Sequence, residues 1–210
     1  MPSAHINPAK LKNCLHNAVD IGKETGSNPV FPCVAVTLDE TGETPSVQTY
    51  GRSHHAVGWS FTEHVSTADE ANTILISHDE AKELGMAVGK TSAAKDATVW
   101  IEITDDMLIV AYGNESIASL AGIEPDPGDI ESINDELDIL DTAKGEQRAA
   151  FAMGIETIKR FTKVRDKTAY MDLLFTGIGN TTYVKIGDNF IGGFEAIDRP
   201  SVQEPKLFTE

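Results

Sequence analysis

Side chains that could do chemistry are few and scattered in this sequence. His54 and His55 are adjacent, beside Arg52 and Ser53, in a segment predicted to be extended. Neighbouring residues of a regular strand point to opposite faces of a sheet, so the two histidines cannot bind one metal ion together. The sequence contains no phosphate-binding glycine loop and no common hydrolase signature. We therefore expect no catalytic residue, no metal site and no other cofactor, and predict that the protein is not an enzyme.

Two further pairs have structural interpretations. The dipeptide at 105–106, Asp-Asp, fits a turn between strands better than an acid–base pair, and Cys14 with His16 fits a helix surface. Because Cys14 and Cys33 are the only cysteines, we expect buried thiols and a reducing, cytoplasmic setting rather than a disulfide framework. No apolar run is long enough to cross a bilayer.

The distribution of charge points to a possible partner. A net charge of −16 over 210 residues argues against nucleic acid, because polyanions repel one another. The basic residues, however, gather in and beside three predicted helices, and a shared helical face could contact phosphate groups. The alternative is that lysine and arginine simply favour solvated helices. The candidate DNA contacts are Lys10, Lys12, Lys23, Lys82, Lys90, Arg148, Lys159, Arg160 and Lys163.

The elements that must position these residues repeat a helix followed by antiparallel strands. The first helix is predicted to begin after Asn7, an N-cap, with Pro8 at the first helical position. An apolar strand over residues 30–38 and a second extended run over 46–61 follow. Pro32 belongs at the start or the edge of the first strand, because it cannot donate to a ladder.

The second copy begins with a capping box, in which Ser77 precedes Glu80 by three residues at the start of a helix. A hairpin that turns at 105–106 follows it. Residues 114–145 interrupt the pattern; they are acidic and contain two prolines, and we interpret them as a crossover or linker.

The third copy begins with a helix over residues 146–164. Its apolar stripe is predicted to hold Phe151, Ile155, Ile158 and Phe161. Strands follow over 169–177, 180–187 and 189–197, and the Gly192–Gly193 pair indicates a bulge or a close backbone approach.

These patterns predict an α+β fold of repeated helix and antiparallel hairpin units. Residues 1–115 are predicted to form a domain of two half-units, and 147–200 a further half-unit. Between them, 116–146 form an acidic linker or a degenerate half-unit, and 201–210 are an irregular tail.

The order of segments resembles the sliding clamp of bacterial DNA polymerase III, its β subunit, in a shortened form such as a phage would carry. Gly51 precedes Arg52 where the family often has Asp, and the Met-Pro that usually ends its closing strand is missing. The segments that carry the resemblance are NPVFPCVAVTLDE with VQTYGRSHHAVG, TILISHDEAKELGMAV with TVWIEITDDMLIVAYGNESIASLAG, and IKRFTKV with MDLLFTGIGNTTYVKIGDNFIGGFEAI.

The resemblance implies a DNA-clamp-like fold with the helices on one face of the sheets. It further implies a homo-oligomeric ring of chains joined head to tail, with the helices lining the hole, that encircles double-stranded DNA without reading its sequence. It also implies a DNA polymerase partner, and a clamp loader as a further candidate partner. Three half-units do not make whole domains. If residues 115–146 complete a fourth half-unit, the chain has two whole domains, which suits a three-chain ring. Otherwise the chain holds one and a half domains, and the ring needs more chains or a different assembly.

The tail suggests a protein contact. Gln203, Leu207 and Phe208 resemble the peptides by which polymerases dock on clamps, where Leu and Phe enter an apolar cleft and Gln bonds at its rim. The alternative function is therefore an acidic clamp-like interaction protein, or decoy, that binds host replication proteins without encircling DNA.

Overall fold

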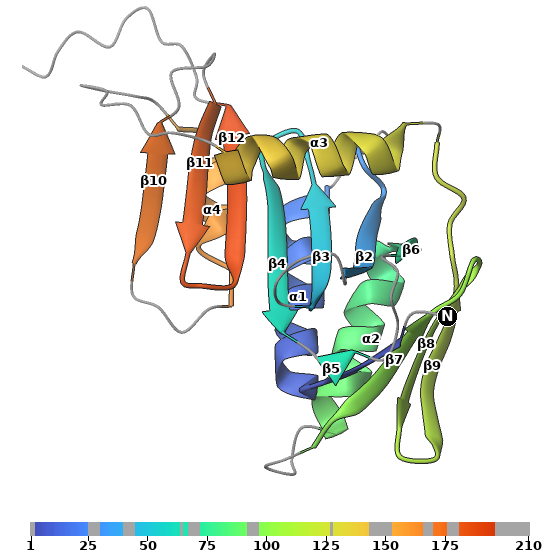
Figure 1. Cartoon of the computed structure of the whole chain (residues 1–210). Helices are drawn as coiled ribbons and strands as arrows, with labels where there is room; N and C mark the ends of the chain where they lie inside the picture. The colour runs from blue at the N-terminus through green and yellow to red at the C-terminus, as the bar shows by residue number, and fades with distance from the viewer. Residues whose placement is uncertain are drawn as a thin grey trace, which may run out of the picture.

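The computed structural model describes most of the chain, and shows helices and antiparallel strands arranged in layers (Figure 1). The backbone alone is described at residues 65–66, 137–142 and 175. The described residues are 3–24, 30–39, 45–63, 65–66, 72–91, 97–126, 128–142, 153–165, 170–175 and 181–195.

The strands form two antiparallel sheets. The helices are α1 (Pro8–Gly22), α2 (His78–Thr91), α3 (Asp129–Thr142) and α4 (Ile155–Phe161). The strands are β1 (Ser3–Ile6), β2 (Cys33–Asp39), β3 (Ser46–Arg52), β4 (Val57–Glu63), β5 (Val65–Ser66), β6 (Asn72–Ser77), β7 (Val99–Ile103), β8 (Met107–Tyr112), β9 (Glu115–Ala121), β10 (Met171–Phe175), β11 (Thr181–Ile186) and β12 (Phe190–Glu195). One sheet has the order β5-β1-β7-β8-β9, and the other β10-β11-β12-β4-β3-β2-β6.

The repeat predicted from the sequence is present and is more complete than expected. A first half-unit, β1-α1-β2-β3-β4, is followed by a second of the same order, β6-α2-β7-β8-β9. Each gives its first strand to the other: β1 pairs antiparallel with β7, and β6 pairs antiparallel with β2. A third half-unit, α4-β10-β11-β12, joins the first where β12 pairs antiparallel with β4.

Both predicted helix starts are confirmed. The Asn7 side chain accepts hydrogen bonds from the backbone N–H groups of Ala9 (2.9 Å) and Lys10 (3.2 Å), so it caps α1. At α2, the Ser77 hydroxyl accepts from the Glu80 N–H (3.2 Å), while the Glu80 carboxylate accepts from the Ser77 N–H (3.0 Å). This reciprocal pair is a capping box.

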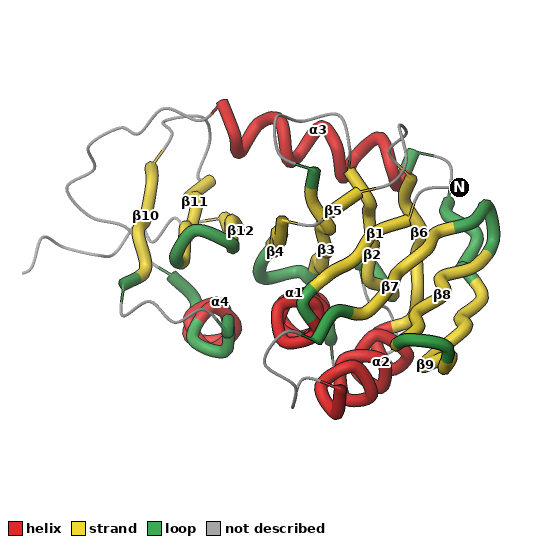
Figure 2. The backbone as a smooth tube through the Cα atoms, turned by 60° about the horizontal axis from the view of Figure 1, so that its bottom comes forward, coloured by secondary structure: helices red, strands yellow, loops and turns green. Residues whose placement is uncertain are grey.

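Three helices cover one face of the sheets. Figure 2 shows α4, α1 and α2 side by side, with α3 on the opposite side of the strands. The main core lies between α1, α2 and the sheets, where Leu11, Leu15 and Leu84 are buried against strand residues such as Val36 and Ile101. The predicted α+β class with helices on one face is confirmed for α1, α2 and α4, and α3 is the exception.

The structure places α3 across the outer face of the larger sheet (Figures 1 and 2). Ile133 of α3 is buried with Tyr50 and Trp59, and the Glu136 carboxylate accepts a hydrogen bond from the Tyr50 hydroxyl at 2.9 Å and pairs with Arg52 at 2.9 Å. The segment interpreted as a crossover or linker thus contains strand β9 and then a helix that packs on the sheet.

The extended run predicted over residues 46–61 is two strands. They are joined by a tight turn in which the Ser53 N–H donates to the Ala56 carbonyl (2.9 Å) and the Ala56 N–H donates to the Ser53 hydroxyl (3.3 Å). Serine side chains that bond the nearby backbone favour turns of this kind. The prediction of one strand was wrong because the apolar pattern continues on both sides of the turn.

The predicted apolar stripe of the third helix is only partly buried. Phe161 is 1 % exposed, but Ile158 is 42 % and Ile155 is 71 % exposed. Thr157 takes the second buried position, where its hydroxyl donates to the His55 carbonyl (3.3 Å). Phe151 lies outside the described residues. The spacing was helical, but α4 turns a different face to the sheet.

Candidate nucleic-acid interface

The predicted DNA contacts that the structure describes lie on or beside the three helices of one face. Lys10 and Lys12 are in the first turns of α1, and Lys23 follows its last residue. On α4, Lys159 and Arg160 precede Lys163 in the turn that follows. The exposed cations of this set are Lys10, Lys23, Lys82, Lys90, Lys159 and Lys163, whereas Lys12 and Arg160 are half-buried. Arg148 lies outside the described residues.

The charges of three cations from different elements act on His16, a residue of α1 whose ring lies against Gly85 of α2. Burial lowers the pKa of His16, and the positive charges of Arg165, Lys12 and Lys82 lower it further, against the opposing effect of Asp20. Arg165 was not among the predicted contacts. It belongs to the basic residues gathered in and beside the third predicted helix, but its position beside α1 follows only from the fold. There its backbone N–H donates to the Asn17 side chain (2.7 Å), and its guanidinium lies 3.7 Å from the Asp20 carboxylate.

Two of the predicted lysines already have acidic partners. The Lys23 ammonium lies 2.6 Å from the Asp79 carboxylate and so links the end of α1 to the start of α2. The Lys159 ammonium lies 2.6 Å from Glu156, one turn earlier on α4. Both pairs are exposed, so water and salt screen them and each can exchange its partner for a phosphate group at little cost.

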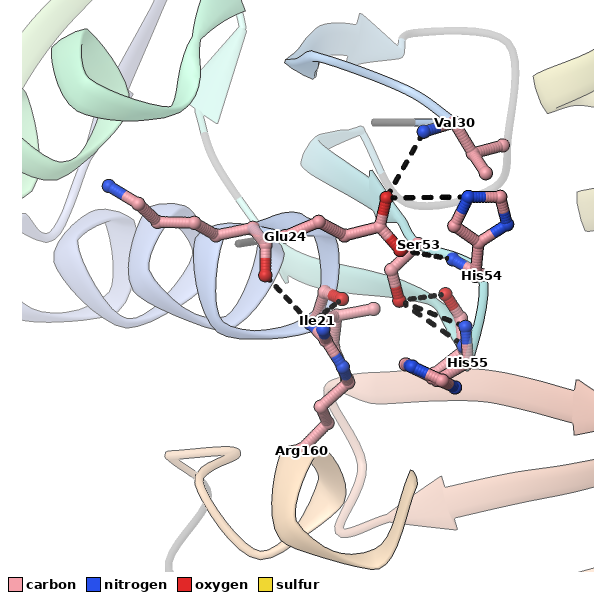
Figure 3. Close-up of polar contacts among 9 residues, drawn as sticks. Ile21, Glu24, Val30, Ser53, His54, His55 and Arg160 are labelled. Carbon is pink, nitrogen blue, oxygen red and sulfur yellow. Dashed lines mark hydrogen bonds and ion pairs between the residues drawn. The ribbon is translucent and has the colours of Figure 1, made fainter. Parts of the chain in front are cut away.

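Arg160 has a different role from the lysines. Its guanidinium donates to the backbone carbonyls of Ile21 (2.7 Å), Lys23 (3.0 Å) and Asp20 (3.4 Å), as Figure 3 shows for Ile21. These are carbonyls at and just beyond the carboxyl end of α1, where a cation is favoured by the helix dipole. Arg160 therefore joins α4 to α1, and its predicted contact with DNA stays a prediction.

The same junction holds the turn between β3 and β4 (Figure 3). The Glu24 carboxylate accepts hydrogen bonds from the backbone N–H groups of His54 (2.6 Å) and Val30 (3.2 Å). Burial acts to raise the pKa of Glu24, but these hydrogen bonds and the charges of His54 and Arg160 outweigh it and hold the pKa below its ordinary value. The histidine pair at 54–55 is thus part of a structural turn.

The remaining predicted features have structural roles or are not described. Both cysteines are buried, as predicted, and burial raises the pKa of Cys14 to about 12 and that of Cys33 to about 11, so both thiols are unreactive. Within the described residues, no three His, Cys, Asp or Glu side chains are grouped to hold a metal ion. The predicted tail contacts, Gln203, Leu207 and Phe208, lie outside the described residues.

The helix face, formed by α1, α2 and α4, carries acidic as well as basic side chains, such as Asp79 and Glu80 in the first turn of α2 and Glu156 in that of α4. Exposed lysines lie on this face, while the outer face carries α3, with Asp129 and Glu131 in its first turn. Among the described helices, none has the length and apolar content needed to span a membrane. A face of this kind can contact a phosphate backbone through scattered ammonium groups, which position a duplex but do not read its bases.

Comparison with known proteins identifies the fold. Neither a protein family model nor a curated protein matches the sequence. Solved structures do match. The DNA polymerase sliding clamp of Bacillus subtilis aligns with a TM-score of 0.64 and 11 % identity, over 100 % of this chain and 68 % of that chain. The DNA polymerase III β subunit of Thermotoga maritima aligns with a TM-score of 0.67 and 8 % identity, over 95 % and 65 %.

A DNA polymerase III β subunit from Eubacterium rectale, described as putative, aligns with a TM-score of 0.68 and 10 % identity, over 93 % of this chain and 65 % of that one. The chain thus corresponds to about two thirds of the length of these proteins. At such low identities the likeness shows the fold alone. This chain has the fold of the bacterial DNA polymerase sliding clamps.

Proposed function

We propose that this protein is a DNA sliding clamp, a non-enzymatic processivity factor whose homo-oligomeric ring encircles duplex DNA and tethers a DNA polymerase. The observation that supports it is the shared face of α1, α2 and α4, which carries exposed lysines from three separate parts of the chain. The fold of the matched structures adds to it, because they are DNA polymerase sliding clamps and β subunits.

The charge distribution suits a protein that encloses DNA and contacts it only weakly, so that it can slide. Each lysine that contacts a phosphate releases counterions and adds affinity that does not depend on sequence. A strongly basic protein would adhere to any nucleic acid, whereas a net charge of −16 opposes such adhesion. The proposed contacts are the lysines of the helix face together with Arg165. Arg160 stays a proposed contact as well, although its guanidinium already donates to three carbonyls at the end of α1.

The test compares single lysine replacements on the two faces. Lys82→Ala and Lys163→Ala remove a charge from the helix face, and Lys185→Ala removes one from β11. Lys185 is exposed and alternates along β11 with Val184 and Ile186, which pack in the cluster around Phe161, so it points away from α4. The three variants change net charge equally, so they separate a local contact from a general charge effect.

Binding to a short duplex is measured across a range of salt concentrations. We expect each helix-face variant to bind more weakly, and its slope of log affinity against log salt to fall by up to about 0.9, the value for one lost phosphate contact. Lys185→Ala should behave as the parent protein does. Equal effects at all three positions would contradict the proposal. An absence of any DNA binding would favour the decoy alternative, which predicts binding to a host clamp instead.

A further inference from the structure

Among the described residues, the third half-unit lacks the neighbouring strand that each of the first two has on its outer edge. In the first half-unit, β2 pairs on its outer edge with β6, the first strand of the second. In the second, β7 pairs with β1, the first strand of the first. The strand at the same place in the third half-unit is β10, and among the described strands it pairs with β11 alone.

Within the described part of the chain, the helix of the third half-unit also has no neighbouring helix on one side. α1 and α2 pack so closely that a Cβ at Gly85 of α2 would lie 2.6 Å from the His16 ring. Successive residues of a helix are about 100° apart, so Ile158 and Ile155 of α4 lie on the side opposite Arg160, which contacts α1. These two isoleucines are 42 % and 71 % exposed. α4 thus exposes apolar side chains where α1 and α2 contact each other.

A second open edge lies at the other end of the repeat. The first and third half-units meet through their last strands, β4 and β12, which pair antiparallel. The last strand of the second half-unit is β9, and within the described chain it pairs with β8 alone. β9 has the sequence ESIASLA, without the lysine or proline that commonly protects a free edge from pairing.

We propose that both open surfaces are closed by second copies of this chain through two-fold axes. The third half-units of two copies form one domain, in which Ile155 and Ile158 of each face the other copy, and β9 pairs antiparallel with β9 of another copy. The occupant is a second copy because the repeat shows that similar half-units complete one another. When a strand pairs with the same strand of a second copy across a two-fold axis, the two strands run antiparallel. β4 and β12 also pair antiparallel where the first and third half-units meet.

The consequence is a ring built from two alternating two-fold interfaces, so the number of chains is even. This assembly differs from a head-to-tail ring, in which each copy uses one surface to bind a different surface of the next. The inference rests on the proposed function, because encircling DNA is the reason for a ring. It is tested without DNA, so that the two can fail separately.

The experiment measures solution mass by light scattering after size-exclusion chromatography, over a range of concentrations, for the 22.7 kDa chain. The α4 variant carries Ile155→Glu and Ile158→Glu, and the β9 variant carries Ser119→Lys, which places like charges across a β9–β9 pair. All three positions are exposed, so the variants should fold, and circular dichroism checks this. The control is Met86→Glu, which is 47 % exposed and lies on α2, on neither α4 nor β9.

We expect the parent and the Met86→Glu variant to form the same oligomer of an even number of chains. Each interface variant should give two chains, and the combined variant one. A parent that stays monomeric when concentrated, an odd number of chains, or single variants that fall directly to one chain would each overturn the inference. An even oligomer that fails to bind duplex DNA would leave this inference standing and contradict the proposed function.

Discussion

At the scale of single residues, the basic side chains divide by what they contact. Lys82 and Lys163 extend into solvent on the helix face, whereas Arg160 bonds three backbone carbonyls at the end of α1. The sequence predicted where the cations lie but gave them one common role. It could not predict the structural role of Arg160, because the carbonyls that its guanidinium contacts lie 137 to 140 residues earlier in the chain.

We expect Arg160→Met to lower the free energy of unfolding by about 1–3 kcal/mol, the usual range for lost hydrogen bonds to a charged group. Methionine keeps the aliphatic length and removes the donors. Lys159→Met is the matched control, because the Lys159 ammonium pairs only with the exposed Glu156 among the described residues. Its effect should stay within about 0.5 kcal/mol. Urea unfolding of both variants checks this, and similar losses would contradict it.

His78 gives the protein a pH dependence. Its ring lies against Gly22, it is 9 % exposed, and its Nε2 atom is buried without a partner in the described structure. Burial lowers the pKa of His78 below the ordinary value of 6.5, and the charge of Lys23 lowers it further. Below pH 6.5 the unfolded chain therefore binds a proton that folded His78 does not, and the stability of the folded state decreases.

We expect NMR to show that His78 titrates below pH 6.5, and the free energy of unfolding to fall as the pH decreases from 7 toward 5. In a His78→Gln variant that part of the loss should disappear. His5→Gln, at an exposed position of β1, is the control and should keep it. A His78 that titrates at or above 6.5 would refute the assignment.

At the scale of elements, patterns that act within a few residues were predictable and long-range pairings were not. Asn7 and the Ser77–Glu80 box define helix starts from local chemistry, and both are confirmed. β1 was not predicted, because four residues are too few to show an alternation of apolar and polar side chains. β1 is a strand because it pairs with β7, about 95 residues later. α3 was missed because its segment is acidic, while its packing depends mainly on Ile133 and Glu136.

The glycine pair in β12 offers a matched test of the junction between the first and third half-units. A Cβ at Gly192 would lie 2.6 Å from the Val57 carbonyl oxygen and 2.9 Å from the Phe161 ring, whereas one at Gly193 meets its nearest atom at 3.4 Å. This confirms the predicted close approach, and β12 pairs with β4 and β11 in regular register.

We expect Gly192→Ala to destabilise the protein by about 1–3 kcal/mol, the usual cost of overpacking. Gly193→Ala should change the stability by less than about 1 kcal/mol, because its added methyl group meets only ordinary contacts. Thermal unfolding of the two variants measures the difference. Equal effects would show that β12 does not approach β4 as closely as the structure indicates.

At the scale of the whole molecule, the acidic composition and the basic helices are parts of one arrangement. The helices α1, α2 and α4 share a face, and the strands and α3 form the wall behind them (Figure 2). The resemblance to the sliding clamps predicted this layering, whereas the clustering of basic residues in helices was only compatible with it. The sequence left the number of half-units open. The structure shows that β9 completes the second half-unit and that α3 packs on the outer face of the larger sheet.

The exchange of first strands also determines when this protein can finish folding. Ile6 pairs with Val99, and Gly58 pairs with Gly192, so no half-unit completes its sheet from its own residues. Such distant pairings are slow to form. During synthesis, β1 must wait for β7 to leave the ribosome, and the edge of β4 stays open until β12 appears. The nascent chain therefore exposes pairing edges for most of its translation, and it is the kind of chain that benefits from chaperones.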